Sequence, residues 1–445
     1  MTTAVPDATS AYYDPAVETM ARDRIEQQQL AALLDLLPHA YEHAPLVRMV
    51  WEEAGVHPRD IRTLDDFRHL APFVDKDAVR RYRDAHDDPF GGICAVPIDE
   101  LTAVMSTSGT TGDPTLVPEQ WGGARRGPPA LARDFWGMGV RPGDDFMLCL
   151  FTFRGPTYAF VQSLGARPIV CDFHGHEMPR LCDLSLRYRP TGLYNFGSVL
   201  IDAVAEHCDA TGLDPAEVFD SYRGVVFAGE PLGRRDRDRA ESWGVELYEH
   251  TSVADVGYAF ECGEHDGLHT WEDMAFVEAL DAETGTPLAP GSFGPQRRVE
   301  LVGTTLVNRV GPLLRHRSDD LVRMSFEACA CGRTHARVWP IGRKGDEVLV
   351  GGRAVLPVDV WDAVQSVDAC ARGLFQVVRP RREVDRLQLR VGYSSRWRDR
   401  LAAVEDGVRA AVAAAVGVEP DVELVPDEVL LRLGPPHKIP RVARR

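Results

Sequence analysis

Hydroxyl and glycine residues are concentrated in one short segment, STSGTTGDP (106–114). On such a loop, consecutive backbone amides and side-chain hydroxyls can form a concave site for an anion such as phosphate. The segment is not a Walker loop, because no Gly-Lys-Ser/Thr sequence follows it. A polar surface turn is the alternative, since glycine and serine are also common in turns. The residues concerned are Ser106, Thr107, Ser108, Gly109, Thr110, Thr111 and Gly112.

Cysteine and histidine are concentrated in two further segments, ECGEHDGLH (261–269) and CACGRTH (329–335). Three thiolates and one imidazole suit a tetrahedral Zn²⁺ ion, which accepts sulfur and nitrogen ligands. Cys-x-Cys is a weaker signal than Cys-x-x-Cys, so reduced cysteines beside a hairpin are the alternative. The candidate ligands are Cys262, His265, His269, Cys329, Cys331 and His335.

Composition limits the class of protein and its partners. The chain has 445 residues, of which 44% are hydrophobic, and this suits two or three domains with a substantial core. The formal net charge of −17 argues against a nucleic acid as partner. The first residues lack the pattern of a secretory signal, and no apolar run of about 18 residues predicts a membrane span. The nine mostly scattered cysteines indicate reduced thiols and a cytoplasmic location.

The pattern of hydrophobic residues along the chain predicts an α/β fold. Residues 1–90 have mainly helical apolar spacing, whereas short apolar strands alternate with helical stretches from residue 100 onward. A sheet covered by helices is therefore expected, with ligands beyond the carboxyl ends of its strands. A β-rich block is expected over about 272–325. The strands expected in the helix-covered sheet are 144–153, 166–173, 191–196 and 222–231.

Beyond about residue 340 the pattern changes to that of a small α+β unit. Two alternating segments predict a hairpin (374–380 and 385–393), followed by a helix (397–417) and a strand (421–426). The basic, proline-containing tail GPPHKIPRVARR (434–445) is expected to be an exposed loop.

Motifs in chain order resemble those of the adenylate-forming superfamily, and within it the phenylacetate–CoA ligase-like branch. The matching segments are APFVDKDAVRR (71–81), the hydroxyl-rich loop, FAGEP (227–231), YEHTSVADVGYAFEC (248–262), GLHTWED (267–273), RHRSDDLVRM (315–324), IGRKGDEVL (341–349) and HKIPRVARR (437–445). The resemblance implies activation of a carboxylate by ATP to an acyl-adenylate, with pyrophosphate released. A nucleophile, commonly the thiol of CoA, then accepts the acyl group. It also implies a large N-terminal domain of layered sheets and helices with a β-rich subdomain (1–341), a hinge (342–346) and a small mobile α+β lid domain (347–445).

The resemblance assigns roles to individual residues. The hydroxyl-rich loop would bind the β- and γ-phosphates, and Asp320 would accept hydrogen bonds from both ribose hydroxyls. A surface aspartate paired with Arg317 or Arg323 is the alternative for Asp320. Lys438 aligns with the catalytic lysine of the lid, although His437 stands where the family usually has glycine. The other implied residues are Gly229, Glu230, Pro231 and Tyr248 at the nucleotide, and Thr251 and Arg343 in catalysis, with Arg343 also at the nucleotide.

The largest departure from the family lies at YEHTS (248–252). The family has glutamate at the last position, where it holds Mg²⁺ against the phosphates of ATP, but this chain has Ser252. A hydroxyl weakens such a site, because Mg²⁺ prefers anionic oxygen ligands. Glu249, Asp255 and Glu230 are the candidates to compensate.

Two further sites follow from the resemblance. Some members have a structural zinc in the region of the cysteines, and the matching GLH segment selects Cys262, His269, Cys329 and Cys331 as its ligands. The acyl pocket is predicted to include Tyr158, Phe196, Tyr248 and His250 around an aromatic acid, with Arg154 at a second acidic group. Core packing is the alternative for the aromatic residues, which more often lie in the interior.

Three interpretations remain open at this stage. In the first, a small, aromatic carboxylic acid is activated with ATP and Mg²⁺ and transferred to CoA. In the second, adenylation is kept but the acceptor changes: an amine would yield an amide, and nitrite activation would yield a diazo product. In the third, the chain binds nucleotide or a partner but has lost turnover. The expected partners are the acid and ATP. Neither a nucleic acid nor a membrane is expected as a partner, and the chain could form a homodimer.

Overall fold

The computed structural model describes residues 7–106, 116–120, 130–150, 157–172, 174–434 and 438–444. The chain forms two compact units, each built from three separate stretches of sequence. The first unit comprises residues 1–137, 152–164 and 250–340, and the second comprises 138–151, 165–249 and 341–445. Among the described residues, no helix combines the length and apolar character needed to cross a membrane.

The N-terminal part of the first unit is helical, as its apolar spacing predicts. In α2 (Arg22–His43), buried residues recur at positions 25, 29, 33, 36, 37 and 40, which form one face of a helix. That face packs into a core with the fully buried rings of Trp51 and Phe67. The other helices of this unit are α1 (Pro15–Glu18), α3 (Pro45–Glu53), α4 (Leu64–Leu70), α5 (Lys76–His86), α6 (Ala130–Gly137) and α7 (Thr157–Ser163), with 3-10 turns η1 (Pro58–Asp60) and η2 (Ile98–Glu100).

The β-rich block of the first unit is an antiparallel sheet in the order β12-β11-β13-β14-β15-β10-β9-β8. It is longer than predicted, because the short strands that precede residue 272 carry polar residues that the hydrophobic pattern does not mark. Apolar residues of β11, β13 and β14 alternate into a shared core that includes Val277, Leu301 and Val322. The strands are β8 (Leu247–Val253), β9 (Gly257–Glu261), β10 (Leu268–Thr270), β11 (Ala275–Asp281), β12 (Pro287–Leu288), β13 (Arg298–Thr305), β14 (His316–Ser325) and β15 (Arg337–Arg343).

Three shorter strands complete the first unit. β1 (Val74–Asp75) pairs in parallel with the start of β14, at Val74 and His316. β2 (Ala103–Ser106) and β3 (Leu116–Glu119) form an antiparallel hairpin in which Ser106 lies opposite Leu116. The hairpin therefore holds Ser106 opposite Leu116, the described residues on either side of 107–115.

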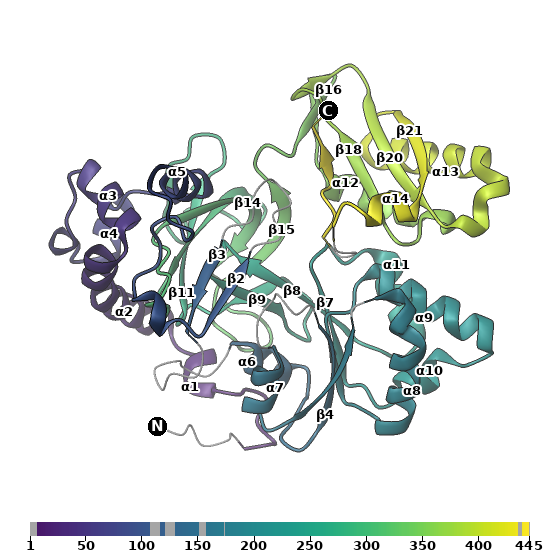
Figure 1. Ribbon diagram of the computed structural model, residues 1–445, viewed down its shortest axis with the longest axis horizontal. Coiled ribbons are helices and arrows are strands. Elements are labelled where there is room, and N and C mark those ends of the chain that lie inside the picture. Colours follow the sequence, from purple (N-terminus) through teal and green to yellow (C-terminus); the bar gives the residue numbers. More distant parts are fainter. Residues whose placement is uncertain are drawn as a thin grey trace. The chain divides into compact units, whose positions relative to one another are not determined.

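The second unit contains the predicted parallel strands, in the order β7-β6-β4-β5. Their core packs against α8, α9 and α10, which lie beside the sheet in Figure 1. β5 is only partly buried, whereas the sequence predicts a buried strand, because it lies at the edge of the sheet. The elements are β4 (Asp145–Leu150), β5 (Arg167–Asp172), β6 (Gly192–Tyr194), β7 (Gly224–Ala228), α8 (Met178–Tyr188), α9 (Ser198–Thr211), α10 (Pro215–Phe219), α11 (Arg234–Ser242) and η4 (Gly175–Glu177).

Residues 347–445 of the second unit have a hydrophobic core of their own. The predicted hairpin and helix are confirmed as β18 paired with β20 and as α13, whose buried Val404, Val408 and Val412 recur every four residues. The elements are β16 (Val348–Val350), β17 (Arg353–Val355), α12 (Pro357–Gln365), η5 (Asp368–Cys370), β18 (Phe375–Val378), β19 (Glu383–Val384), β20 (Leu387–Tyr393), η6 (Ser395–Arg400), α13 (Leu401–Val416), β21 (Pro420–Pro426), α14 (Asp427–Leu431) and β22 (Val442–Ala443).

The prediction of an exposed C-terminal loop is wrong for residues 439–443. β22 pairs in parallel with β18, and Ile439 is only 3% exposed. The guanidinium of Arg441 lies 4.1 Å from the centre of the Trp361 ring. A basic tail normally stays in water, but an arginine that stacks on aromatic rings and meets a carboxylate can be buried.

Candidate functional site

The predicted phosphate loop is described only at its first residue. Ser106 ends β2 and is half-buried, opposite Leu116 of β3. The other predicted loop residues, Thr107 to Gly112, lie outside the described residues, as does Arg154 of the predicted acyl pocket.

Asp320 lies on β14 as a half-buried carboxylate. The hydroxyl of Ser318 donates a hydrogen bond to its Oδ2 over 2.7 Å. The two arginines that the alternative interpretation would pair with it have other partners: Arg317 forms a two-fold ion pair with Glu300, and Arg323 donates to Gln296. Both arginines thus have other partners, and the ribose-binding role of Asp320 stays a prediction.

The side chains of β8 alternate between the interior and solvent. Tyr248 and His250 are buried, Thr251 is half-buried opposite Ala259, and Ser252 is exposed opposite Tyr258. The imidazole of His250 packs near the rings of Tyr258 and Phe260, with centroids 5.2 and 6.4 Å away. Burial lowers the pKa of His250 to about 4, so the imidazole is neutral near pH 7.

The three carboxylates considered as replacements for the missing glutamate each have a protein partner. Glu249 accepts a hydrogen bond from the backbone amide of Leu232 over 3.2 Å. Asp255 forms an ion pair of 2.8 Å with Lys76, and His316 lies 3.6 Å from the same oxygen. Burial alone would raise the pKa of Asp255, but the hydrogen bond from His316 and the charge of Lys76 outweigh it and hold this pKa well below its usual range.

Glu230 is the third of these carboxylates and follows β7 directly, after Gly229. Its Oε1 accepts from the backbone amide of Ser198 over 2.9 Å, and its Oε2 lies 3.1 Å from Arg441. Burial raises the pKa of Glu230 to about 7, against the opposing effect of the Arg441 charge. Gly229 has a φ of +96°, which glycine adopts at little cost, so the turn between Ala228 and Pro231 depends on it.

Two predicted pocket residues have different environments. Tyr158 lies on α7 with 48% of its surface exposed. Phe196 is 1% exposed and packs against Phe219 in the core of the second unit. The core interpretation therefore fits Phe196 better than a substrate contact does.

Arg343 and Lys438 both belong to the second unit. Arg343 ends β15, and its carbonyl accepts from the amide of Asp346 over 3.1 Å, which closes a turn through Gly345. Gly345 has a φ of +84°. Lys438 is half-buried and directly precedes the buried Ile439. The hinge assigned to residues 342–346 stays a prediction.

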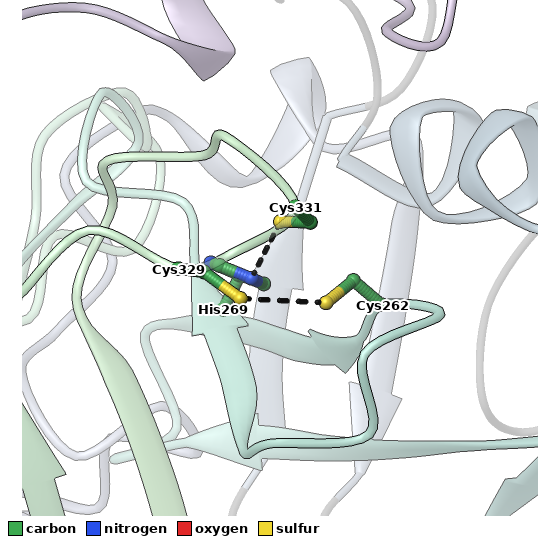
Figure 2. Close-up of side chains that lie close together, drawn as sticks. All are labelled: Cys262, His269, Cys329 and Cys331. Carbon is green, nitrogen blue, oxygen red and sulfur yellow. Dashed lines mark hydrogen bonds between the residues drawn. The ribbon is translucent and has the colours of Figure 1, made fainter.

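The predicted cysteine and histidine ligands converge in the first unit. Figure 2 shows the side chains of Cys262, His269, Cys329 and Cys331 directed toward one another, and their ligand atoms all lie within 4.8 Å of one another. The Sγ atoms of Cys262 and Cys329 are 3.8 Å apart, and Sγ of Cys331 lies 3.5 Å from Nε2 of His269. Three soft sulfur donors and one imidazole, mostly buried, are a donor set that fits Zn²⁺.

The two remaining histidines near this cluster have other contacts. Nδ1 of His265 lies 3.1 Å from Glu261. The ring of His335 contacts the carbonyl of Val17 and accepts from the amide of Glu272. The geometry thus selects the same four residues that the sequence motif selects.

Sequence reasoning missed one residue beside this cluster. Arg333 donates to Sγ of Cys331 over 3.7 Å and forms an ion pair of 2.9 Å with the buried Glu18. The ring of Tyr12 lies under the same guanidinium, and its hydroxyl donates to the carbonyl of Cys331. More than 300 residues separate these partners in the chain, so no local pattern could reveal the contact.

Comparison with known proteins adds independent evidence. No protein-family model matches the chain. The phenylacetate–coenzyme A ligase of Thermus thermophilus is 32% identical over 392 residues, which cover 86% of this chain and 84% of that protein. The chain belongs to the phenylacetate–CoA ligase family. The enzyme of the same name from Escherichia coli is 28% identical over 430 residues, which cover 94% of both proteins.

Solved structures agree with this family assignment. The crystal structure of 2-hydroxyisobutyryl-CoA ligase in the postadenylation state, in complex with 2-HIB-AMP, matches with a TM-score of 0.84 and 26% identity. The match covers 100% of this chain and 94% of that one. The predicted resemblance and α/β fold are thereby confirmed, and the chain is an acid–CoA ligase of the adenylate-forming type.

Proposed function

We propose that this ligase activates a small aromatic carboxylic acid with ATP and transfers the acyl group to CoA. The observation that carries the proposal is the identity of 32% over 86% of the chain to an enzyme named phenylacetate–CoA ligase.

The reaction has two steps. A carboxylate oxygen attacks the α-phosphorus of ATP, and the bond to pyrophosphate breaks. The sulfur of CoA then attacks the acyl carbon, AMP leaves, and the thiol proton passes to solvent. Both reactants of the first step are anions, so the site has to neutralise charge and align them.

We assign the residues of the first step as follows. The amides and hydroxyls from Ser106 to Gly112 bind the β- and γ-phosphates, and Asp320 binds the ribose hydroxyls. Lys438 bridges the carboxylate and the α-phosphate, where negative charge accumulates in the transition state. Thr251 and Arg343 complete the catalytic set.

Mg²⁺ would enter with ATP and neutralise charge on its phosphates. Position 252 offers a hydroxyl, and the three carboxylates considered as replacements, Glu249, Asp255 and Glu230, already have protein partners. We therefore propose that the protein itself holds Mg²⁺ weakly.

We also propose that Cys262, His269, Cys329 and Cys331 bind a structural Zn²⁺ ion. The protein would fill all four ligand positions, which is typical of structural rather than catalytic zinc. None of the nine cysteines forms a disulfide, which supports the proposal of a cytoplasmic location.

A different acceptor is the second candidate function. The replacement at Ser252 and the presence of Glu249 separate this chain from the motif that it resembles, and this favours a changed reaction. The acyl group could pass to an amine, which gives an amide, or nitrite could be activated by ATP and react with an amino group of the substrate, which gives a diazo product and water. Adenylation with release of pyrophosphate is common to these reactions and to acyl-CoA formation.

Pyrophosphate release with ATP and a panel of aromatic acids tests the first step. Mass analysis of products formed with CoA, amines or nitrite then identifies the acceptor. An acyl-CoA product supports the proposal, whereas an amide or diazo product selects the second candidate. No pyrophosphate release with any acid or with nitrite would contradict both.

A further inference from the structure

A closed set of contacts within the second unit joins the C-terminal tail to the loop that follows β7. Nη2 of Arg441 lies 3.1 Å from Oε2 of Glu230, and Oε1 of Glu230 accepts from the backbone amide of Ser198. The hydroxyl of Ser198 donates to Oδ2 of Asp236 over 2.7 Å. The start of α9 thus connects Glu230 at the end of β7 with Asp236 on α11.

Two residues of α12, Gln365 and Trp361, connect Asp236 back to Arg441 and so close the set of contacts. Nε2 of Gln365 donates to the same Asp236 oxygen over 2.8 Å, and Nε1 of Trp361 donates to Oε1 of Gln365 over 3.1 Å. The ring of Trp361 in turn lies under the guanidinium of Arg441. Each polar member therefore has at least two partners within the set.

Burial makes these contacts depend on one another. Asp236 and Gln365 are 2% and 0% exposed, and the side chains of Glu230 and Arg441 are 2% and 15% exposed. A buried charge that loses its partner is strongly unfavourable, so removal of one member affects the others. The backbone has adapted to this packing: a Cβ atom at Gly233 would lie 1.9 Å from Oε1 of Gln365.

The same contacts fix the backbone that directly follows Lys438. Ile439 packs in an apolar cluster with Val199, Leu374 and Leu430. The amide of Val377 donates to the carbonyl of Arg441 over 2.8 Å. The residues on both sides of Pro440 are therefore held in place, and Lys438 directly precedes them.

We propose that Arg441 is a positioning residue for the adenylation step, and that the carboxylate of Glu230 holds the tail rather than Mg²⁺. The inference rests on the proposed function, in which Lys438 acts at the α-phosphate. Arg441 orients Lys438 through the backbone of residues 439–441 and does not itself touch the substrate. The ring of Trp361 packs against the flat face of the Arg441 guanidinium, and the carboxylate of Glu230 pairs with Nη2 at its edge.

Rates of the two reaction steps distinguish a positioning role from a purely structural one, because loss of positioning slows adenylation alone, whereas a structural defect slows both steps. We would measure pyrophosphate release for the adenylation step, and acyl-CoA formation from supplied acyl-adenylate for the second step. Arg441→Gln and Glu230→Gln should each slow adenylation by about 10- to 100-fold, as expected when a reacting group is misplaced by about 1 Å. Transfer from supplied acyl-adenylate should change by less than about two-fold, because it does not use Lys438.

Three comparisons sharpen the experiment. The double variant should be no slower in adenylation than the slower single variant, because both changes break one contact. Arg441→Lys, which keeps the charge but not the planar stacking, should recover part of the rate. Arg386→Gln removes an exposed arginine that pairs with Asp421 and should leave both steps unchanged.

The outcomes are distinguishable. Equal loss of both steps, or normal adenylation in Arg441→Gln, would overturn the positioning role while the proposed function stands. Absence of pyrophosphate release in the parent enzyme would overturn the proposed function and the inference together. A melting temperature of Arg441→Lys close to that of the parent would show that its altered rate does not arise from unfolding.

Discussion

Position 252 is where this ligase differs most from its family at the scale of single residues. Ser252 is exposed on β8, while the acidic residues considered as replacements have partners of their own, as Asp255 has in Lys76. A carboxylate committed to a lysine and a histidine is a poor Mg²⁺ ligand, because binding would have to break that ion pair. The hydroxyl at 252 should therefore have a measurable consequence.

Ser252→Glu should lower the Mg²⁺ concentration needed for half-maximal pyrophosphate release by about ten-fold, equivalent to about 1.4 kcal/mol. The reason is that an anionic oxygen binds Mg²⁺ better than a hydroxyl does. Ser292→Glu, which adds the same charge at another exposed serine, is the control. An unchanged Mg²⁺ dependence would show that some other group already supplies the missing ligand.

The buried imidazole of His250 predicts a pH dependence of stability. Its folded-state pKa of about 4 lies below the ordinary value of 6.5, so the unfolded state binds a proton first as the pH falls. The stability associated with the neutral ring is complete above about pH 6.5 and is lost between there and pH 4, by an amount on the order of 3 kcal/mol.

Urea unfolding at pH 8 and at pH 5 tests this prediction. The free energy of unfolding should fall less between the two pH values in His250→Gln than in the parent. The exposed His174→Gln is the matched control and should behave like the parent. An identical fall in His250→Gln and the parent would contradict the assigned burial effect.

At the scale of elements, the cysteine cluster is assembled by three separate parts of the antiparallel sheet. Cys262 follows β9, His269 lies on β10, and the segment with Cys329 and Cys331 connects β14 to β15. A metal ion there would tie these strands to one another, and the nearby Arg333 would tie the same loop to Glu18 of α1.

Purified protein should contain about one equivalent of zinc per chain, measured by elemental analysis without added metal. Chelation should lower the melting temperature, and Cys329→Ser should lower both zinc content and stability, because a structural metal contributes directly to folding. Cys94→Ser, at a half-buried thiol outside the cluster, should retain the metal. Zinc well below half an equivalent in the parent would contradict the proposal.

Elements and motifs differ in how far the sequence predicts them. Apolar spacing alone predicts the parallel strands β4, β6 and β7 and the helix α13. A buried strand needs a continuous apolar run and a helix with one buried face needs apolar residues every three to four positions, so the sequence pattern shows the element directly. The convergence of Cys262, His269, Cys329 and Cys331 follows from the resemblance, in which the GLH segment selects these four from six candidates. The burial of Arg441 does not follow, because its partners Glu230 and Trp361 are distant in the chain.

At the scale of the whole molecule, the two steps of the proposed reaction need Lys438 to different degrees: adenylation uses it, whereas transfer to CoA does not. Residues 347–445 have their own core, and their tail carries both Lys438 and the buried Arg441. Turn residues such as Gly345 allow the hinge predicted at 342–346 to change its dihedral angles at small steric cost. A movement of this segment between the steps would bring Lys438 to the first and remove it from the second.

The rates of the two half-reactions in Lys438→Ala test directly whether Lys438 acts in adenylation and not in transfer. Acyl-adenylate formation should fall by about 10²-fold or more with little change in ATP affinity, because the lysine acts mainly in the transition state. Transfer from supplied acyl-adenylate to CoA should continue at a rate close to that of the parent. A preserved rate of adenylation in Lys438→Ala would contradict the account.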